Sequence, residues 1–116
     1  MKFSGAMIGS ENPGRLGAFY SKVLGDPTWH DGTWYGWEGD ANLMIGAHSD
    51  VHGTNPTPQR IILTLVVDDV DTAFKELTAL GAEVVAEPYQ TDGGPRLATV
   101  TDPDGNYVQM SPVWED

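Results

Sequence analysis

Few side chains in this sequence could do chemistry, and the histidines are the first to consider. The chain has 3 histidines and no cysteine, which excludes a disulfide framework, a thiol nucleophile and a thiolate metal site. His48 and His52 lie four positions apart, in a stretch rich in Gly and Pro where spacing fixes no geometry. Imidazole and phenol groups can transfer protons, so His48 and Tyr107 are weak candidates for proton transfer. For the other histidines we expect surface positions.

The stretch 98–111, ATVTDPDGNYVQMS, supplies further polar candidates. It predicts two short strands joined by a turn, because Pro103 presets φ and Gly105 can adopt the positive φ that closes the turn. Alternation along the second strand gives it one apolar face, which suits packing against a helix. The other face suits a pocket wall, because it carries a phenol, an amide and a hydroxyl from Tyr107, Gln109 and Ser111.

These strands belong to a pattern that occurs twice along the chain. Each half predicts one strand, one helix and three further strands. The first helix should start at Asn12 and Pro13 and end at Gly25, and the second should start at Asp68 or Asp69 and end at Gly81. The predicted strands are 2–9, 28–30, 33–38, 42–48, 60–67, 83–86, 97–101 and 107–113.

This pattern predicts an α+β fold built from two βαβββ modules in one chain. Each module should be a curled, four-stranded mixed sheet with one helix on one face. The faces that the helices leave uncovered would form a cup-shaped cavity, which is where ligands bind. We expect a single domain over 1–116, with module 1 at about 1–50, a connector at about 49–58 and module 2 at about 59–116.

The charge of the chain limits its partners. There are 17 acidic and 6 basic residues, for a net charge of −11. Such a chain should repel nucleic acid and anionic lipid and attract cationic ligands, although solubility alone would also explain the charge. No run of apolar residues is long enough for a signal peptide or a membrane span, so we expect a cytoplasmic protein without membrane or nucleic-acid partners.

Three segments together resemble the vicinal oxygen chelate superfamily: AFYSKVLG, VDDVDTAFKELTALGAEV and DPDGNYVQM. That superfamily includes glyoxalase I, extradiol dioxygenases, fosfomycin-resistance enzymes and bleomycin-resistance proteins. The resemblance covers essentially the whole chain. It implies the fold described above and says little about chemistry.

The resemblance also identifies where a metal would be held. Metalloenzyme members hold a divalent ion with His or Glu side chains from the first, fourth, fifth and eighth strands. The matching positions here are occupied by Gly5, Met44, Ile62 and Gln109. Divalent ions of this kind need carboxylate or imidazole ligands. We therefore expect no metal and no cofactor.

The lining of the cup follows from the alternation of the strands. Trp34 and Trp37 should point to opposite faces of one predicted strand, so at most one of them faces the cup, where it could stack on a ligand. Arg96 could bind a ligand carboxylate or pair with a neighbouring acid. Ile61, with Leu63 and Leu65, should face the helix instead. The candidate ligand-binding residues are Phe3, Met7, Trp34, Trp37, Met44, His48, Ile62, Thr64, Arg96, Tyr107, Gln109 and Ser111.

Three functions are consistent with this sequence. We favour a metal-independent protein that binds a small organic ligand, cationic or aromatic, similar to the bleomycin-resistance members that sequester a drug. The alternative is a glyoxalase-like enzyme, an isomerase, lyase or cyclase working without a metal, or a metal-dependent one if the ligand positions are misaligned. A degenerate member with a structural or regulatory role is the third. We expect a homodimer, because an exposed edge rich in Trp would otherwise aggregate.

Overall fold

The computed structural model describes residues 1–113, which divide into two compact units. Unit 1 comprises Met1–Gly53, and unit 2 begins at Thr54. Whether the two units act as a single domain stays a prediction. No helix of residues 1–113 is long and apolar enough to cross a membrane.

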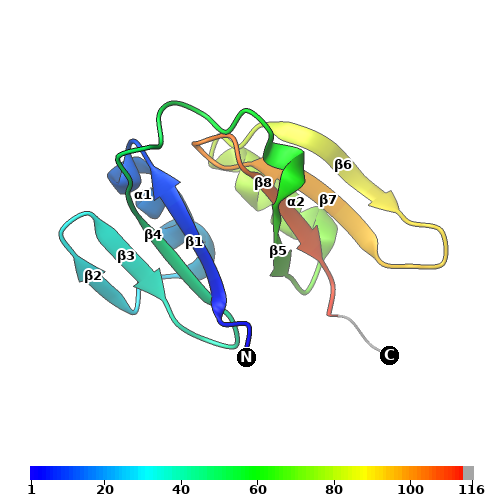
Figure 1. Ribbon diagram of the computed structural model, residues 1–116. Coiled ribbons are helices and arrows are strands. Elements are labelled where there is room, and N and C mark those ends of the chain that lie inside the picture. The colour runs from blue at the N-terminus through cyan, green and yellow to red at the C-terminus, as the bar shows by residue number, and fades with distance from the viewer. Residues whose placement is uncertain (114–116) are drawn as a thin grey trace. The chain divides into compact units, whose positions relative to one another are not determined.

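Unit 1 contains one helix and a four-stranded mixed sheet (Figure 1). Strand β1 pairs in parallel with β4, whereas β4, β3 and β2 are antiparallel neighbours, giving the order β1-β4-β3-β2. The elements are β1 (Gly5–Ser10), α1 (Pro13–Leu24), β2 (Trp29–Asp31), β3 (Trp34–Trp37) and β4 (Asn42–Ala47).

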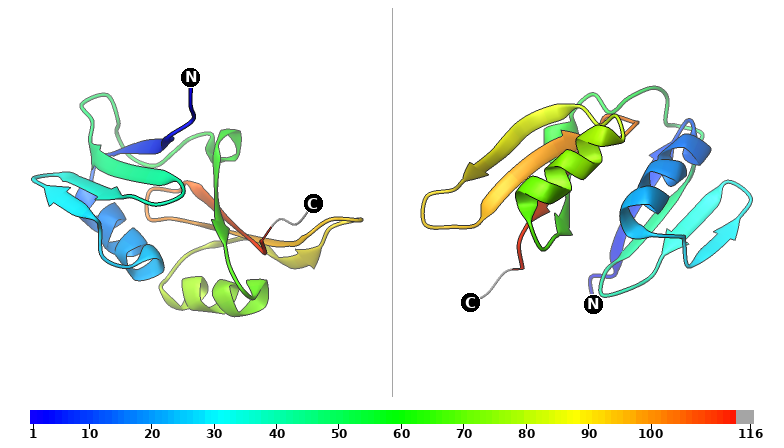
Figure 2. Two further views of the ribbon diagram at one scale, coloured as in Figure 1. Left: turned by 90° about the horizontal axis from the view of Figure 1, so that it is seen from below. Right: turned by 180° about the vertical axis from the view of Figure 1, so that it is seen from behind.

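Unit 2 repeats this arrangement with the strand order β5-β8-β7-β6. In each unit the helix covers one face of its own sheet (Figure 2). The predicted α+β fold with two βαβββ modules is therefore confirmed. The elements are a 3₁₀ helix (Pro58–Arg60), β5 (Ile62–Val66), α2 (Val70–Ala79), β6 (Val84–Gln90), β7 (Arg96–Thr101) and β8 (Tyr107–Ser111).

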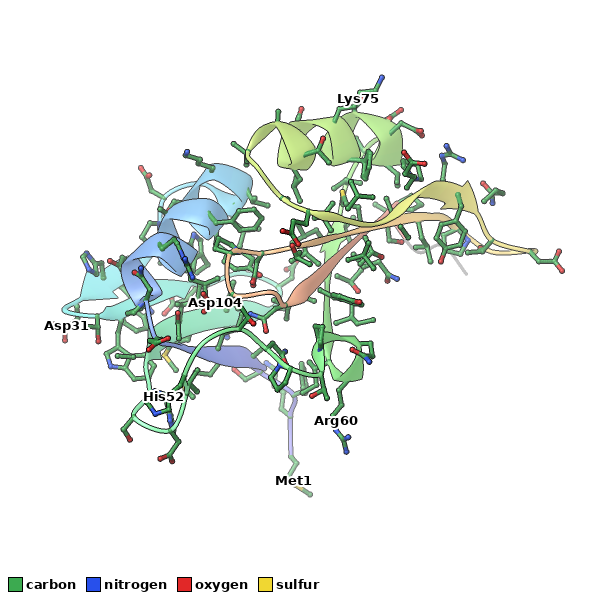
Figure 3. The ribbon with its side chains drawn as sticks, turned by 90° about the horizontal axis from the view of Figure 1, so that it is seen from above. Met1, Asp31, His52, Arg60, Lys75 and Asp104 are labelled. Carbon is green, nitrogen blue, oxygen red and sulfur yellow. The ribbon has the colours of Figure 1, made fainter. Side chains whose placement is uncertain are left out.

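Both helices start where their capping residues predict. The side chain of Asn12 accepts a hydrogen bond from the backbone N–H of Arg15 at 3.2 Å. Of the two aspartates before α2, Asp69 is the cap, because its side chain accepts from the N–H of Thr72 at 2.8 Å. On the outer side of α2, Lys75 points away from the sheet (Figure 3).

The core of unit 1 lies between α1 and one face of the sheet. Leu16, Tyr20 and Ile45 are fully buried there. Trp37 faces this core and is only 7% exposed, with its ring edge-on to Tyr20 at a centroid distance of 6.4 Å. Its indole N–H donates to the carbonyl oxygen of Gly25 at 2.9 Å, which satisfies the one polar group of the buried ring.

The core of unit 2 lies between α2 and the apolar face of its sheet. Ala98, Val100, Val108 and Met110 are fully buried there, which confirms the alternation predicted for the last strand. The prediction for Ile61 is wrong: it is 73% exposed, because Pro58–Arg60 form a 3₁₀ turn and β5 begins only at Ile62.

Strand β6 is longer than predicted, since it continues past Ala86 to Gln90. Its pairing with β7 has irregularities between Val84 and Ala86 and between Ala86 and Tyr89. Pro88, which has no N–H to donate, is tolerated because β6 is an edge strand of the sheet. Irregular pairing and proline both hinder the addition of a further strand at this edge.

The turn between β7 and β8 has the predicted form. Gly105 has a φ of 80°, and its N–H donates to the carbonyl oxygen of Asp102 at 3.0 Å. Oδ1 of Asp102 accepts from the N–H groups of Asp104 and Asn106 at 2.9 and 3.0 Å. The carboxylate thus holds the turn that sets Tyr107 and the rest of β8 in register.

Candidate ligand-binding site

The face of the unit 1 sheet that α1 leaves uncovered, here called the open face of unit 1, carries a continuous row of residues. Met7 is the register partner of Met44 across β1 and β4. Met44 in turn faces Gly36 across β3, and Gly36 faces Trp29 across β2. Residues opposite each other in a sheet share a face. Two thioethers and one indole therefore lie along a single line across all four strands.

Glycines in this face make room for the indole rings. A side chain at Gly36 would occupy the position of the Trp29 ring, and a side chain at Gly46 would occupy that of the Trp34 ring. Each indole consequently lies against the backbone of the neighbouring strand. This close approach is what the missing Cβ permits.

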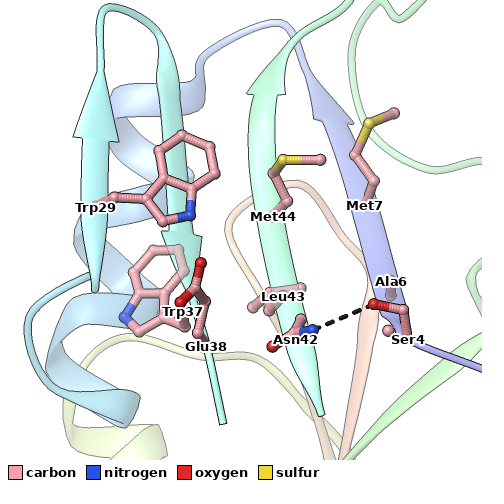
Figure 4. A pocket seen from close by; sticks show the side chains of 10 residues that line it. Ser4, Ala6, Met7, Trp29, Trp37, Glu38, Asn42, Leu43 and Met44 are labelled. Atoms are coloured by element: carbon pink, nitrogen blue, oxygen red, sulfur yellow. Dashed lines mark hydrogen bonds between the residues drawn. The ribbon is translucent and has the colours of Figure 1, made fainter.

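A pocket of about 340 Å³ lies on this part of unit 1 (Figure 4). Trp29 and the two methionines supply apolar side chains to its lining, and Glu38 supplies a carboxylate. Most ligand pockets combine such an apolar lining with a few polar groups. The lining residues are Ser4, Gly5, Ala6, Met7, Trp29, Trp37, Glu38, Asn42, Leu43 and Met44.

The polar groups of the pocket come from its rim. The side-chain amide of Asn42 donates to Oγ of Ser4 at 3.2 Å, and its carbonyl oxygen accepts from the N–H of Gly39 at 3.2 Å. Glu38 follows β3 directly, and its backbone N–H donates to Oγ1 of Thr28 at 2.9 Å. Among the lining residues Glu38 is the only ionisable one.

The structure distributes the predicted site residues of unit 1 unevenly. Met7 and Met44 line the pocket, whereas Phe3 precedes β1 and is 87% exposed. Trp34 is the tryptophan of the predicted pair that lies on the open face, against Gly46, but it is not among the lining residues. Trp37 packs in the core and is nevertheless one of the lining residues. Sequence reasoning missed the other lining residues, whose placement depends on the register of the four strands: Ser4, Gly5, Ala6, Trp29, Glu38, Asn42 and Leu43.

The histidines lie outside the lining of the pocket. His48 follows β4, stands against Gly9 on the open face, and its Nδ1 accepts from the N–H of Asp50 at 3.1 Å. His30 stacks on Tyr35 with a centroid distance of 4.2 Å. His52 lies in the loop after β4 (Figure 3).

Apart from Arg96, the predicted residues of unit 2 share the face of its sheet opposite α2. Thr64 and Gln109 are register partners, and the hydroxyl of Thr64 donates to Oε1 of Gln109 at 3.3 Å. Ile62 is the register partner of Tyr107 and is partly exposed. Ser111 is buried, and its hydroxyl donates to the carbonyl oxygen of Pro112 at 3.0 Å.

Arg96 forms an ion pair, which was one of its two predicted roles. Its guanidinium donates two hydrogen bonds to the carboxylate of Asp71 at 2.7 and 2.8 Å. These bonds lower the pKa of Asp71 below its ordinary value of 3.8 and raise the pKa of Arg96. The pair joins the first turn of α2 to β7, so its role within unit 2 is structural.

Replacing Asp71 with asparagine should lower the free energy of unfolding slightly at neutral pH, because both side chains are partly exposed and water screens the pair. The carboxyl has a lowered pKa in the folded state, so its stabilising effect is present above pH 3.8 and disappears as the pH falls through the folded pKa. Urea unfolding at several pH values should show the variant and the native protein converging in acid. A difference that grows on acidification would contradict this prediction.

The four positions implied for a metal do not fit a divalent ion. Gly5 has no donor, and the backbone carbonyl of Asn42 occupies the space that any side chain at position 5 would need. Met44 offers a thioether, Ile62 an alkyl group, and the amide of Gln109 accepts from Thr64. Within residues 1–113, no three His, Cys, Asp or Glu side chains group in a way that could hold a metal ion.

Two βαβββ units, each with its helix on one face of its own sheet, define a protein of the vicinal oxygen chelate superfamily. A family model described as a glyoxalase-like domain matches residues 6–110, so the chain belongs to the glyoxalase-like domain family. No protein of curated function matches the chain.

Solved structures share the fold over nearly the whole chain. A glyoxalase/bleomycin resistance protein/dioxygenase family enzyme from Burkholderia phytofirmans PsJN is 21% identical, with a TM-score of 0.80 over 98% of this chain and 100% of that one. A glyoxalase/bleomycin resistance protein from Catenulispora acidiphila DSM 44928 is 26% identical, with a TM-score of 0.65 over 97% of each. TioX from Micromonospora sp. ML1 is 18% identical, with a TM-score of 0.71 over 97% of this chain and 98% of that one.

Proposed function

We propose that this protein binds a small organic molecule in the unit 1 pocket and needs no metal to do so. The pocket of about 340 Å³ on the open face of unit 1 carries this proposal. Its size and its lining of thioethers and indole suit an organic ligand. Membership of the glyoxalase-like family is consistent with such a role.

Sequestration of the ligand, as in bleomycin-resistance proteins, is favoured over turnover. Among the lining residues, Glu38 is the only ionisable group and Ser4 the only hydroxyl. The Ser4 hydroxyl accepts from the amide of Asn42, and within the described residues no hydrogen bond joins it to Glu38, the one carboxylate of the lining. A serine nucleophile requires an adjacent base. The lining therefore has the means to bind and orient a ligand but lacks an activated nucleophile.

Binding of the neutral apolar dye Nile red to chelator-treated protein tests this proposal. We expect saturable fluorescence enhancement with one site per chain, unchanged by added divalent ions. Replacing Met44 with lysine should weaken binding by about tenfold or more, because a charge would stand in the apolar row. Met44→Leu is the matched control and should bind as the native protein does. A requirement for a divalent ion, or native-like binding by a folded Met44→Lys, would overturn the proposal.

The protein is further proposed to act as a homodimer. On the face of the unit 2 sheet opposite α2, the apolar side chains of Ile62 and Val66 are 41% and 61% exposed. Exposed apolar side chains on one sheet face favour cover by another surface. Native mass spectrometry of the purified protein should give the mass of two chains, and a monomer at micromolar concentration would contradict this expectation.

A further inference from the structure

We propose that the ligand of the unit 1 pocket is a planar organic cation that stacks on the indole of Trp29, with its charge facing Glu38. This inference rests on the proposed function, because it assigns the chemical class of the molecule that the pocket binds. Neither residue belongs to the positions that the superfamily uses to hold a metal.

The first support is the way in which Trp29 is held. Its ring lies over Gly36, where a Cβ would collide with the indole. The indole therefore rests against the backbone of β3 on one side, and it lines the pocket (Figure 4). A fixed aromatic plane favours a flat partner, since stacking maximises contact between two rings.

The second support is the charge of the pocket. Glu38 contributes a carboxylate, and no basic residue is among the lining residues. Within the described part of the chain, this carboxylate makes no ion pair with a basic side chain. A cation entering the pocket would therefore meet an opposite charge that no lysine or arginine neutralises. The face of an indole also attracts cations through its quadrupole.

The third support is the rest of the row across the sheet. Met44 and Met7 continue the line from Trp29 towards the edge strand β1. Thioethers are polarisable and flexible, so they adapt to the edge of an aromatic ligand without demanding one shape. The row thus supplies the apolar contact, Glu38 supplies the charge, and the net charge of −11 raises the local concentration of cations.

Three bicyclic probes of similar size separate shape from charge. They are N-methylquinolinium, which is a cation, quinoline, which is neutral at mildly alkaline pH, and 2-naphthoate, which is an anion. Quenching of tryptophan fluorescence or titration calorimetry would give the three affinities. We expect the cation to bind about five- to tenfold more tightly than quinoline, with 2-naphthoate weakest. Added salt should reduce this preference, because it screens the partly exposed charge.

Variants then assign the preference to individual residues. Glu38→Gln should reduce the ratio of the affinity for N-methylquinolinium to that for quinoline, because the carboxylate that favours the cation is removed while the indole remains. Glu87→Gln in β6 is the matched control, because it removes the same charge from an exposed position of unit 2. Trp29→Leu keeps apolar contact but removes the aromatic plane, and it should weaken the binding of all three probes.

Two results would overturn the inference. One is equal affinity of the native protein for the cation and for quinoline, and the other is an undiminished preference in Glu38→Gln. Binding of Nile red distinguishes failure of the proposed cation preference from failure of the proposed small-molecule function. If Nile red binds and the charge preference is absent, the pocket is a general apolar site. If neither Nile red nor any of the three probes binds, the small-molecule function itself is wrong.

Discussion

Replacing Gly36 with valine should both destabilise unit 1 and abolish ligand binding at its pocket. A glycine within a strand ordinarily weakens it, so a side chain at this position would stabilise β3 if space were available. Here the space is filled by the Trp29 indole. Overpacking of this kind costs about 1–3 kcal/mol in the free energy of unfolding. The displaced ring would also leave the pocket without its aromatic wall.

Urea unfolding and Nile red titration of the same samples measure both effects. Gly46→Val is the matched variant, because it displaces the Trp34 ring, which is not among the lining residues. It should show the loss of stability without the loss of binding. Gly39→Val should show neither, because the nearest heavy atom to a Cβ there, the Ala41 carbonyl oxygen, is at the ordinary distance of 3.7 Å.

A double variant tests the cause directly. In Gly36→Val combined with Trp29→Ala, the new side chain has room, so we expect the free energy of unfolding to be higher than the sum of the two single effects predicts. Binding should remain lost, because the indole is absent. Native-like affinity in a folded Gly36→Val would show that the ring over Gly36 has no part in the site.

The periodicity of the sequence was sufficient to predict the fold because each element has a local physical cause. Asn12 and Asp69 cap the helices, Gly105 closes the last turn, and alternation along β8 separates its buried residues from its open face. These signals act within a few residues of one another. They can be recognised from the sequence without knowledge of the tertiary structure, and they were enough to place the helices and most of the strands.

The site was harder to predict because it depends on which strands are neighbours and in what register. Trp29 belongs to a strand of only three residues, and its position follows from pairing with Gly36. The alternation of side chains along a strand placed Trp34 and Trp37 on opposite faces of the sheet but could not decide which of them faces α1. That choice is made by the hydrogen bond from Trp37 to Gly25 and by its contact with Tyr20. Side-chain alternation alone contains no such information.

Introducing histidine at Gly5 should fail to create a metal site, although the resemblance to the superfamily implies that this is a metal-ligand position. The backbone carbonyl of Asn42 occupies the space that a side chain at position 5 requires, and these two residues are register partners of β1 and β4. A large side chain there must push the two strands apart. We therefore expect Gly5→His to lower the free energy of unfolding by about 1–3 kcal/mol.

Thermal unfolding of chelator-treated Gly5→His, with and without added nickel or zinc, measures this effect. The melting temperature should fall relative to the native protein and should not recover with metal, because Met44, Ile62 and Gln109 supply no carboxylate or imidazole. Lys2→His is the matched control, since it adds a histidine at an exposed position before β1. Two results together would contradict this prediction: Gly5→His as stable as the native protein, and a rise in its melting temperature with either metal that is well above the rise for Lys2→His. They would mean that β1 and β4 can move apart without loss of stability. The backbone of Asn42 would then be no barrier to a metal ligand, and absence of metal chemistry would depend on side-chain identity alone.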